Sequence, residues 1–181
     1  MQKRLFIGIS VPENLKKRIF QFVEKEYKNL PVRWVRAVNF HLTLNFLGYI
    51  RDEAIPEICG AMKISAGSLE TFEIRFEKID CGPSEQNKKM IWAVGKRSEI
   101  LEELKFRLEK LLGFHARERK KFVPHITLGR IRKKEWSKLK TEPKTEKDLK
   151  FSLDVNSIEL MESRFEKGKR AYYVLESFSL K

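Results

Sequence analysis

The chain has 181 residues, of which 41% are hydrophobic and 35% are charged. This composition excludes an intrinsically disordered chain, and a chain of this length buries about 70% of the surface that its unfolded form exposes. Its two cysteines, Cys59 and Cys81, are too few for a disulfide framework, and no apolar run approaches the roughly 18 residues that a membrane span needs. We therefore expect a cytoplasmic protein that is neither secreted nor embedded in a membrane.

The charge balance favours an anionic partner. Lysine and arginine together number 38 against 25 acidic residues, which gives a net charge of +13 at pH 7. A field of this sign attracts polyanions, nucleic acid first. Most basic residues are interleaved with acidic ones, as on a surface that only favours solubility or heat tolerance, but they concentrate at residues 117–121 and 130–134. Charge alone thus favours a phosphate-bearing partner.

The first elements are a strand, a helix and two extended segments. Residues 4–9 predict a buried strand, and a helix begins at Pro12 with apolar side chains at helical spacing. These side chains are Leu15, Ile19, Phe22, Val23 and Tyr27. Residues 32–35 are expected to be extended, and residues 41–47 to form a strand that ends at Gly48.

A second helix and two strands follow. The helix is expected at residues 52–66, and the alternation of apolar and charged residues at 72–80 predicts a half-buried strand. Residues 81–84 break this strand, and a polar loop leads to the next strand at residues 90–94.

Ser98 is positioned to cap a third helix, which runs to Leu112 and ends at Gly113. One face of this helix carries a stripe of leucines. They are Leu101, Leu104, Leu108, Leu111 and Leu112. We interpret the stripe as core packing.

The last third is expected to contain three strands. Residues 125–131 form the first, and residues 133–150 are a charged stretch of short helix or loop. Strands at 155–161 and 171–180 are joined by a turn at Gly168.

This order of elements indicates the α+β class. No glycine-rich phosphate loop is present, so a doubly wound nucleotide-binding sheet is not expected. Residues 133–150 resemble a linker, but the strands after them need partners in the main sheet. We therefore expect a single domain over residues 1–181.

Two of the three histidines begin the same tetrapeptide pattern. One copy is His41-Leu42-Thr43-Leu44 and the other is His125-Ile126-Thr127-Leu128, 84 residues further on. This separation is close to half the chain and suggests a duplicated unit. On a strand, alternate residues share a face, so each histidine points the same way as the threonine two residues later.

Two lobes related by a pseudo-two-fold axis would bring these pairs face to face. Such a site suits in-line displacement at phosphorus, because one neutral imidazole can accept a proton while one imidazolium donates another. The hydroxyls of Thr43 and Thr127 would bind phosphate oxygens, and Arg130 could neutralise developing charge. Strand parity places Arg130 opposite His125, so this role requires a twist or bulge at Gly129.

Zinc binding is the main alternative use of two histidines. A zinc site normally has three or four ligands at recognisable spacing, and no cysteine or histidine cluster supplies them. His115 lacks the following threonine and lies in a basic turn, so we interpret it as a surface or structural residue.

With these motifs, the chain resembles the 2H phosphoesterase superfamily, in the RNA 2′,3′-cyclic phosphodiesterase branch historically called 2′-5′ RNA ligases. The two His-x-Thr motifs with their flanks are the specific part of the resemblance, which extends along nearly the whole chain. The matching residues are 4–9, 41–48, 90–92, 119–130, 158–163, 168, 172–173 and 178–180.

The resemblance implies a bilobal α+β fold, with two pseudo-symmetric lobes of mainly antiparallel sheet, helices on the outer faces and the active site in the cleft. It implies hydrolysis of RNA ends bearing a 2′,3′-cyclic phosphate to 2′-phosphomonoesters, without a metal ion or other cofactor. His125 matches the proton acceptor and His41 the proton donor, while Thr43, Thr127 and Arg130 match phosphate-contacting positions. Because the reaction is microscopically reversible, the resemblance also implies 2′-5′ RNA ligation.

The sequence leaves three alternatives open. The chain could be a non-catalytic module that binds RNA ends, or a phosphodiesterase for 2′-5′ oligonucleotides or for small cyclic nucleotide phosphates. The Phe-Pro pair that the family usually carries between Gly82 and Met90 is absent, so Phe40 or Tyr49 could stack a base instead, or pack. No coiled-coil pattern is present, and we expect a monomer.

Overall fold

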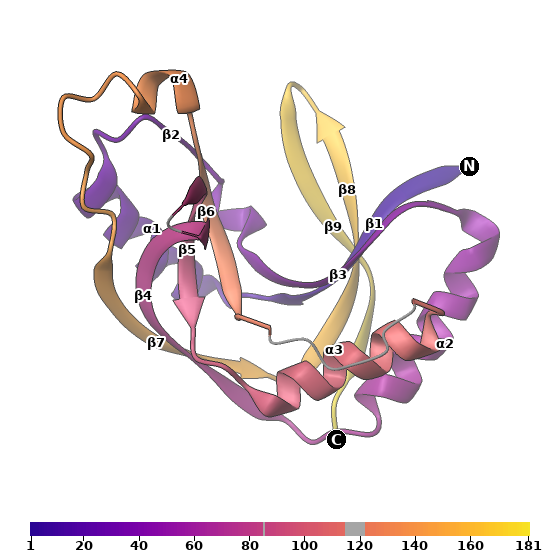
Figure 1. Ribbon diagram of the computed structural model, residues 1–181. Helices are drawn as coiled ribbons and strands as arrows, with labels where there is room; N and C mark the ends of the chain where they lie inside the picture. Colours follow the sequence, from indigo (N-terminus) through magenta and orange to yellow (C-terminus); the bar gives the residue numbers. More distant parts are fainter. Residues whose placement is uncertain (85, 115–121) are drawn as a thin grey trace.

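Nine strands form one curved antiparallel sheet in the computed structural model, which describes residues 1–84, 86–114 and 122–181 (Figure 1). The strands are β1 (Gln2–Ser10), β2 (Val32–Trp34), β3 (His41–Arg51), β4 (Phe72–Ser84), β5 (Asn87–Gly95), β6 (His125–Ile131), β7 (Lys147–Val155), β8 (Ser157–Glu166) and β9 (Lys169–Ser179). The helices are α1 (Glu13–Tyr27), α2 (Ile55–Ala66), α3 (Glu99–Leu111) and the single turn α4 (Lys133–Trp136). Short 3₁₀ turns occupy Ala37–Asn39 and Asp52–Ala54.

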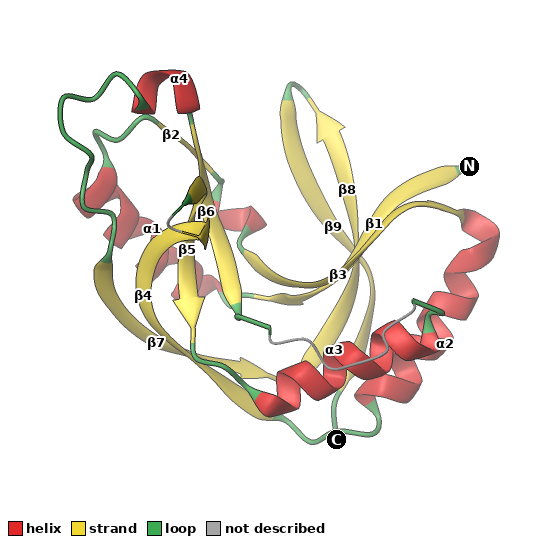
Figure 2. Cartoon of the chain, in the orientation of Figure 1, coloured by secondary structure: helices red, strands yellow, loops and turns green. Residues whose placement is uncertain are grey.

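The strand order divides the sheet into two halves. The order is β7-β4-β5-β6-β3-β1-β8-β9, and β2 pairs with β6 outside this path. The seam between β6 and β3 therefore separates five strands, β7, β4, β5, β6 and β2, from the four strands β3, β1, β8 and β9. The paired residues at this seam are Leu42 and Ile126. Figure 2 shows α2 and α3 together at one end of the sheet and α1 at the other. The predicted α+β class with antiparallel strands and flanking helices is confirmed.

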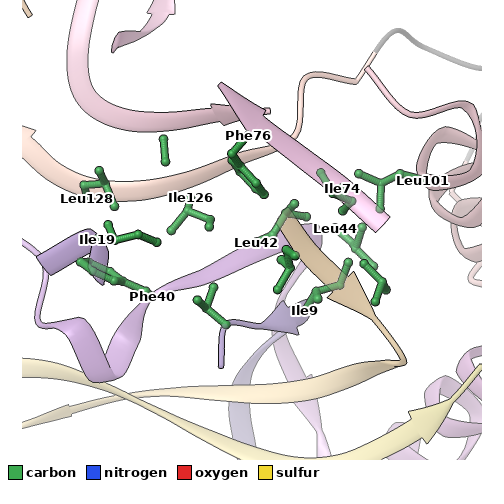
Figure 3. Close-up of a cluster of buried hydrophobic side chains, with 14 of the residues drawn as sticks. Ile9, Ile19, Phe40, Leu42, Leu44, Ile74, Phe76, Leu101, Ile126 and Leu128 are labelled. Carbon is green, nitrogen blue, oxygen red and sulfur yellow. The ribbon is translucent and has the colours of Figure 1, made fainter. Parts of the chain in front are cut away.

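The core lies on one face of the seam (Figure 3). Leu42 and Leu44 of β3 and Ile126 and Leu128 of β6 point into it and are buried. They belong to a single apolar cluster to which both halves of the sheet contribute, together with α1 and α3. The strict alternation of the two tetrapeptides therefore produces the core on one side and turns their polar residues to the other.

Hydrogen bonds attach α1 to the end of the sheet that contains β7. The Tyr27 hydroxyl donates to the Thr145 carbonyl over 2.6 Å, and the Arg18 guanidinium donates to the Lys150 carbonyl over 2.7 Å. Both partners lie more than a hundred residues along the chain, so the N-terminal helix closes over a late strand. Within the described residues, no helix has both the length and the apolar character needed to cross a membrane.

The end predicted for β3 was wrong. The strand does not stop at Gly48 but continues to Arg51, because Gly48 takes a left-handed conformation (φ +81°) inside a bulge. Leu5 pairs with Gly48 while the next residue, Phe6, pairs with Phe46, so Leu47 is the extra residue. Glycine accommodates this conformation without a steric penalty, and the ladder resumes beyond the bulge.

The break predicted at residues 81–84 was also wrong. β4 runs through Gly82 and Pro83 to Ser84, and β5 begins at Asn87, so the hairpin is longer than the pattern indicated. A register shift between Gly82 and Pro83 lets the proline remain in the strand.

The strand β7 was missed. Residues 133–150 do begin with the short helix α4, but from Lys147 onward the chain is a strand paired with β4. Its buried residues are Leu149, Phe151, Leu153 and Val155. Lysine and aspartate between them face outward, and this charge obscured a regular alternation of period two.

The helix α3 tests the assignment of its leucines to the core. Ser98 caps it, its side-chain oxygen accepting from the Leu101 amide over 3.3 Å. Leu104 is 0% exposed, as the core assignment predicts, but Leu111 is 44% exposed, so the interpretation of Leu111 as core packing was wrong. We predict that Leu104→Ala lowers the free energy of unfolding by about 2–5 kcal/mol, because it leaves a cavity, whereas Leu111→Ala costs less than about 1 kcal/mol. Urea unfolding measures both, and equal losses would contradict the difference in burial between the two leucines.

Candidate active site

His41 begins β3 on the face opposite the core, and its ring is held by the backbone. The Nδ1–H group donates to the carbonyl of Asn39 over 2.7 Å, while Nε2 lies 3.0 Å from the hydroxyl oxygen of Thr43. A carbonyl can only accept, so Nδ1 carries the hydrogen and the neutral ring has its lone pair at Nε2. The rings of Phe6 and Tyr172 contact the imidazole, with centroids 4.8 and 4.9 Å away.

His125 is held in the same way at the start of β6. Its Nδ1–H group donates to the carbonyl of Val123 over 2.8 Å, again two residues earlier in the chain. The imidazole stacks on the indole of Trp92, with centroids 3.9 Å apart and the ring planes 26° from parallel. The two histidines are therefore oriented by the same kind of hydrogen bond to a backbone carbonyl, but they have different aromatic neighbours.

Gly82 makes the stack on His125 possible. A Cβ atom at this position would lie 2.2–2.5 Å from three carbons of the Trp92 ring. The glycine in β4 thus leaves room for the indole, which lies between the β4 backbone and the imidazole. In the sequence analysis, Trp92 enters only as one of the residues that resemble the family. Its place in an alternating strand beside the second motif is a signal that could have identified it as a neighbour of the site.

The seam brings the two motifs together. Leu42 pairs with Ile126 in an antiparallel register. Continuing this register by one residue in each direction places Thr43 opposite His125 and Thr127 opposite His41, all on the face away from the core. Diagonal neighbours in such a pair are about 7–8 Å apart, which leaves space for a small group between the two imidazoles.

Arg130 lies on the same face as His125, and a bulge in β6 places it there. On β5, Met90 and Trp92 are two residues apart and share a face, and they pair with Arg130 and Thr127, which are three residues apart. Simple alternation along the sequence would place Arg130 on the face opposite His125. The extra residue in β6 moves it to the same face. The bulge that this role requires is therefore present, and it lies at the predicted place beside Gly129.

Burial shapes the electrostatics of the pair. Removal from water lowers the pKa of both His41 and His125 below the usual value of 6.5, and the like charge of His125 lowers the pKa of His41 further. The hydrogen bond from each Nδ1–H to a backbone carbonyl opposes this shift. Neutral imidazoles therefore persist to more acidic pH than in a free histidine.

The other residues that the sequence analysis considered are a pair of possible stacking aromatics, the third histidine and possible metal ligands. Of the two roles that the sequence leaves open for Phe40, stacking on a base and packing, the structure supports packing, because Phe40 is 3% exposed and lies in the core, whereas Tyr49 is exposed. His115 and the basic segment 117–121 lie outside the described residues. The described residues contain no cluster of three or more His, Cys, Asp or Glu side chains that could hold a metal ion.

Comparison with known proteins places the chain in a family. A model described as LigT-like phosphoesterase matches residues 9–92. A protein of Thermotoga maritima named RNA 2′,3′-cyclic phosphodiesterase is 31% identical over 140 residues, which cover 75% of each chain. The chain belongs to the LigT-like phosphoesterase family. The resemblance seen in its motifs is confirmed, and the chain is an enzyme of the phosphodiesterase type.

Other proteins match this LigT-like phosphoesterase along nearly its whole length. A Methanocaldococcus jannaschii protein, also named RNA 2′,3′-cyclic phosphodiesterase, is 29% identical over 180 residues, covering 97% of this chain and 99% of its own. The crystal structure of E. coli LigT complexed with 3′-AMP has a TM-score of 0.77 at 26% identity and covers 99% of both chains. The crystal structure of a Thermus thermophilus protein, TT0787, has the same score and identity and covers 98% of this chain and 97% of its own.

The electrostatic coupling of the histidines predicts an effect on titration. In the His125→Gln variant of this LigT-like phosphoesterase, the pKa of His41 should rise, because the positive charge that opposes its protonation is gone. NMR titration of the imidazole Cε1–H signal measures this pKa. Lys63→Gln, which removes a positive charge from the exposed surface of α2, is the control and should leave it unchanged. An unaltered His41 pKa in the His125→Gln variant would contradict the coupling.

The fit of Gly82 against Trp92 predicts a stability effect. Gly82→Ala places a methyl group inside the contact radius of the indole and should cost about 1–3 kcal/mol, with a change in the His125 NMR signals as the stack is disturbed. Gly60→Ala is the matched control, because Gly60 lies in α2 with nothing within 4 Å of an added Cβ. It should stabilise the helix by about 0.5–1 kcal/mol. A Gly82→Ala variant as stable as the parent would contradict this packing.

Proposed function

We propose that this LigT-like phosphoesterase hydrolyses the 2′,3′-cyclic phosphate at RNA ends to a 2′-phosphomonoester. The observation that carries the proposal is the antiparallel register at the seam, which sets two backbone-held histidines diagonally across one face, each opposite the other motif's threonine. Relatives named RNA 2′,3′-cyclic phosphodiesterase support the substrate, as does the structure of E. coli LigT with 3′-AMP.

In the proposed mechanism, His125 is the general base and His41 the general acid. The neutral Nε2 of His125 takes a proton from water, and the water oxygen attacks phosphorus. The bond from phosphorus to the 3′ oxygen breaks, and the Nε2–H group of the His41 imidazolium protonates that oxygen. One proton enters at His125 and one leaves at His41, so the products are a 2′-phosphate and a 3′-hydroxyl.

The phosphate group is bound by the residues that share this face. Thr43 and Thr127 each stand opposite a histidine and donate hydroxyl hydrogen bonds to the non-bridging oxygens in this proposal. Arg130, brought to the same face by the β6 bulge, offers a guanidinium to the charge that grows on those oxygens.

The same chemistry supports 2′-5′ RNA ligation. A 5′-hydroxyl in place of water attacks the cyclic phosphate, His125 accepts its proton, and the 3′ oxygen leaves as before. The product is a 2′-5′ linkage, and microscopic reversibility allows its cleavage by the same two histidines.

We also propose that residues 1–181 form a single domain. The late strand β8 pairs with β1, with Met161 opposite Phe6, and one apolar cluster spans both halves of the sheet. Neither half would keep its core if separated from the other.

The decisive assay uses a short RNA with a 2′,3′-cyclic phosphate end in excess EDTA, followed by identification of the product end. We expect a 2′-phosphate. His41→Ala and His125→Ala should each lower turnover by about 100-fold or more while RNA still binds, and Thr43→Ala or Thr127→Ala by about 10- to 100-fold. Thr71→Ala, at an exposed threonine outside both motifs, is the matched control and should be unchanged.

Two results would contradict the proposal. A cyclic end that stays intact while the RNA is bound would make the chain a non-catalytic module that recognises RNA ends. Near-normal turnover by either histidine variant would exclude the two-histidine mechanism.

A further inference from the structure

Two aromatic side chains of β3 are exposed beside the site. Phe46 is 75% exposed and Tyr49 is 72% exposed, although both belong to a strand whose neighbouring residues are largely covered. They are three residues apart, so simple alternation would place them on opposite faces. The bulge at Leu47 instead places both on one face. Phe46 pairs with Phe6 and Tyr49 pairs with Arg4, and Phe6 and Arg4 share a face of β1.

That face is the one that carries His41. Ser10 pairs with His41, Gly8 with Thr43 and Phe6 with Phe46, and these three β1 residues alternate along one side of the strand. Figure 1 shows β1 and β3 running together away from the seam. The exposed rings therefore lie on the path that leads outward from His41.

Ring contacts connect the site to this path. The Phe6 ring lies 4.8 Å from the His41 ring and 6.3 Å from the Phe46 ring, measured between centroids. Tyr172 packs edge-on against both His41 and Phe6, at 4.9 and 5.2 Å. The rings form a row from His41 through Phe6 to Phe46.

The pseudo-two-fold relation gives Phe46 a special position. In β3, Thr43 and Phe46 are three residues apart and pair with Gly8 and Phe6, which are two apart. In β6, Thr127 and Arg130 show the same spacing against β5. Phe46 thus occupies in one half of the sheet the place that Arg130 occupies in the other, with an aromatic ring where the other half has a cation.

Arginines accompany the rings. Arg4 is exposed and pairs directly with Tyr49. Arg170 of β9 pairs with Phe165 on the face that also carries Tyr172, and its guanidinium donates to the Ser163 hydroxyl over 3.0 Å. The nearby carboxylates of Asp52 and Glu162 pair with Lys3 and Arg164 instead, and no ion pair found among the described residues includes Arg4 or Arg170. Both cations are therefore available to a phosphate.

We propose that Phe46 and Tyr49 form a stacking platform for bases upstream of the terminal nucleotide of single-stranded RNA, with Arg4 and Arg170 binding its backbone phosphates. This inference rests on the proposed function and specifies its substrate as an RNA chain rather than a cyclic mononucleotide. Exposed rings interleaved with cations are the pattern by which proteins hold single strands, because every base has a face to stack. A protein partner would instead need a continuous apolar patch.

The test compares two substrates on the same variants. For each enzyme, kcat/KM is measured on a 2′,3′-cyclic mononucleotide and on a short single-stranded RNA with the same cyclic end. The double variant Phe46→Leu, Tyr49→Leu keeps apolar bulk but removes the rings. We expect the ratio of the RNA value to the mononucleotide value to fall by about 5- to 100-fold, mainly through KM, as for the loss of base stacking.

Control variants separate stacking from general damage. Phe20→Leu removes an aromatic ring that is 42% exposed on α1 and should leave the ratio unchanged. Arg4→Gln and Arg170→Gln should each reduce the salt dependence of RNA binding, lowering the slope of log K against log salt by about 0.7 for each lost phosphate contact. Unaltered slopes would exclude the arginines from the RNA path.

The outcomes distinguish failure of the platform from failure of the proposed function. A ratio that the double variant does not change overturns the platform while hydrolysis continues. If neither substrate is hydrolysed by the parent, the proposed function fails, and the platform is then judged by fluorescence anisotropy with RNA ending in a 3′-phosphate. Equal binding of that RNA by the parent and the double variant would overturn the platform in that case as well.

Discussion

The pairing of Leu42 with Ile126 across the β3–β6 seam is the constraint on which the rest of the structure depends. Both side chains are fully buried and join the apolar surfaces of the two sheet halves into one core. Because alternate residues of a strand face opposite ways, burying this pair necessarily turns the histidines and threonines of the motifs to the other face. Core packing and site geometry are therefore one constraint, and a slip of one residue in the register would destroy both together.

The backbone follows the pseudo-two-fold relation more closely than the side chains do. Each histidine donates from Nδ1 to a carbonyl two residues earlier, so both rings are oriented without help from a carboxylate. The surroundings then differ, since Phe6 and Tyr172 enclose His41 while Trp92 stacks on His125. A symmetric frame with unequal packing suits a reaction in which one imidazole must accept a proton and the other must donate one.

Bulges in β3 and β6 determine which residues join the site face. Thr127 and Arg130, and likewise Phe46 and Tyr49, are separated by three positions and share a face only because an extra residue interrupts the ladder between them. Gly48 takes the left-handed conformation that one of these bulges uses. The curvature of the sheet and the composition of its functional face thus have the same structural origin.

The sequence by itself determined whatever depends on neighbours along the chain. Helical periodicity located α1 and α3, and the two tetrapeptides identified both the family and the residues of the candidate site, because these patterns are local. Only the tertiary structure decided that Arg130 lies on the same face as His125, that Gly82 makes room for Trp92, and that Phe40 is buried while Tyr49 is exposed. Those outcomes depend on the register between strands distant in sequence, which no local pattern contains, and the strand β7 was missed because its outward charges obscured the alternation of its core residues.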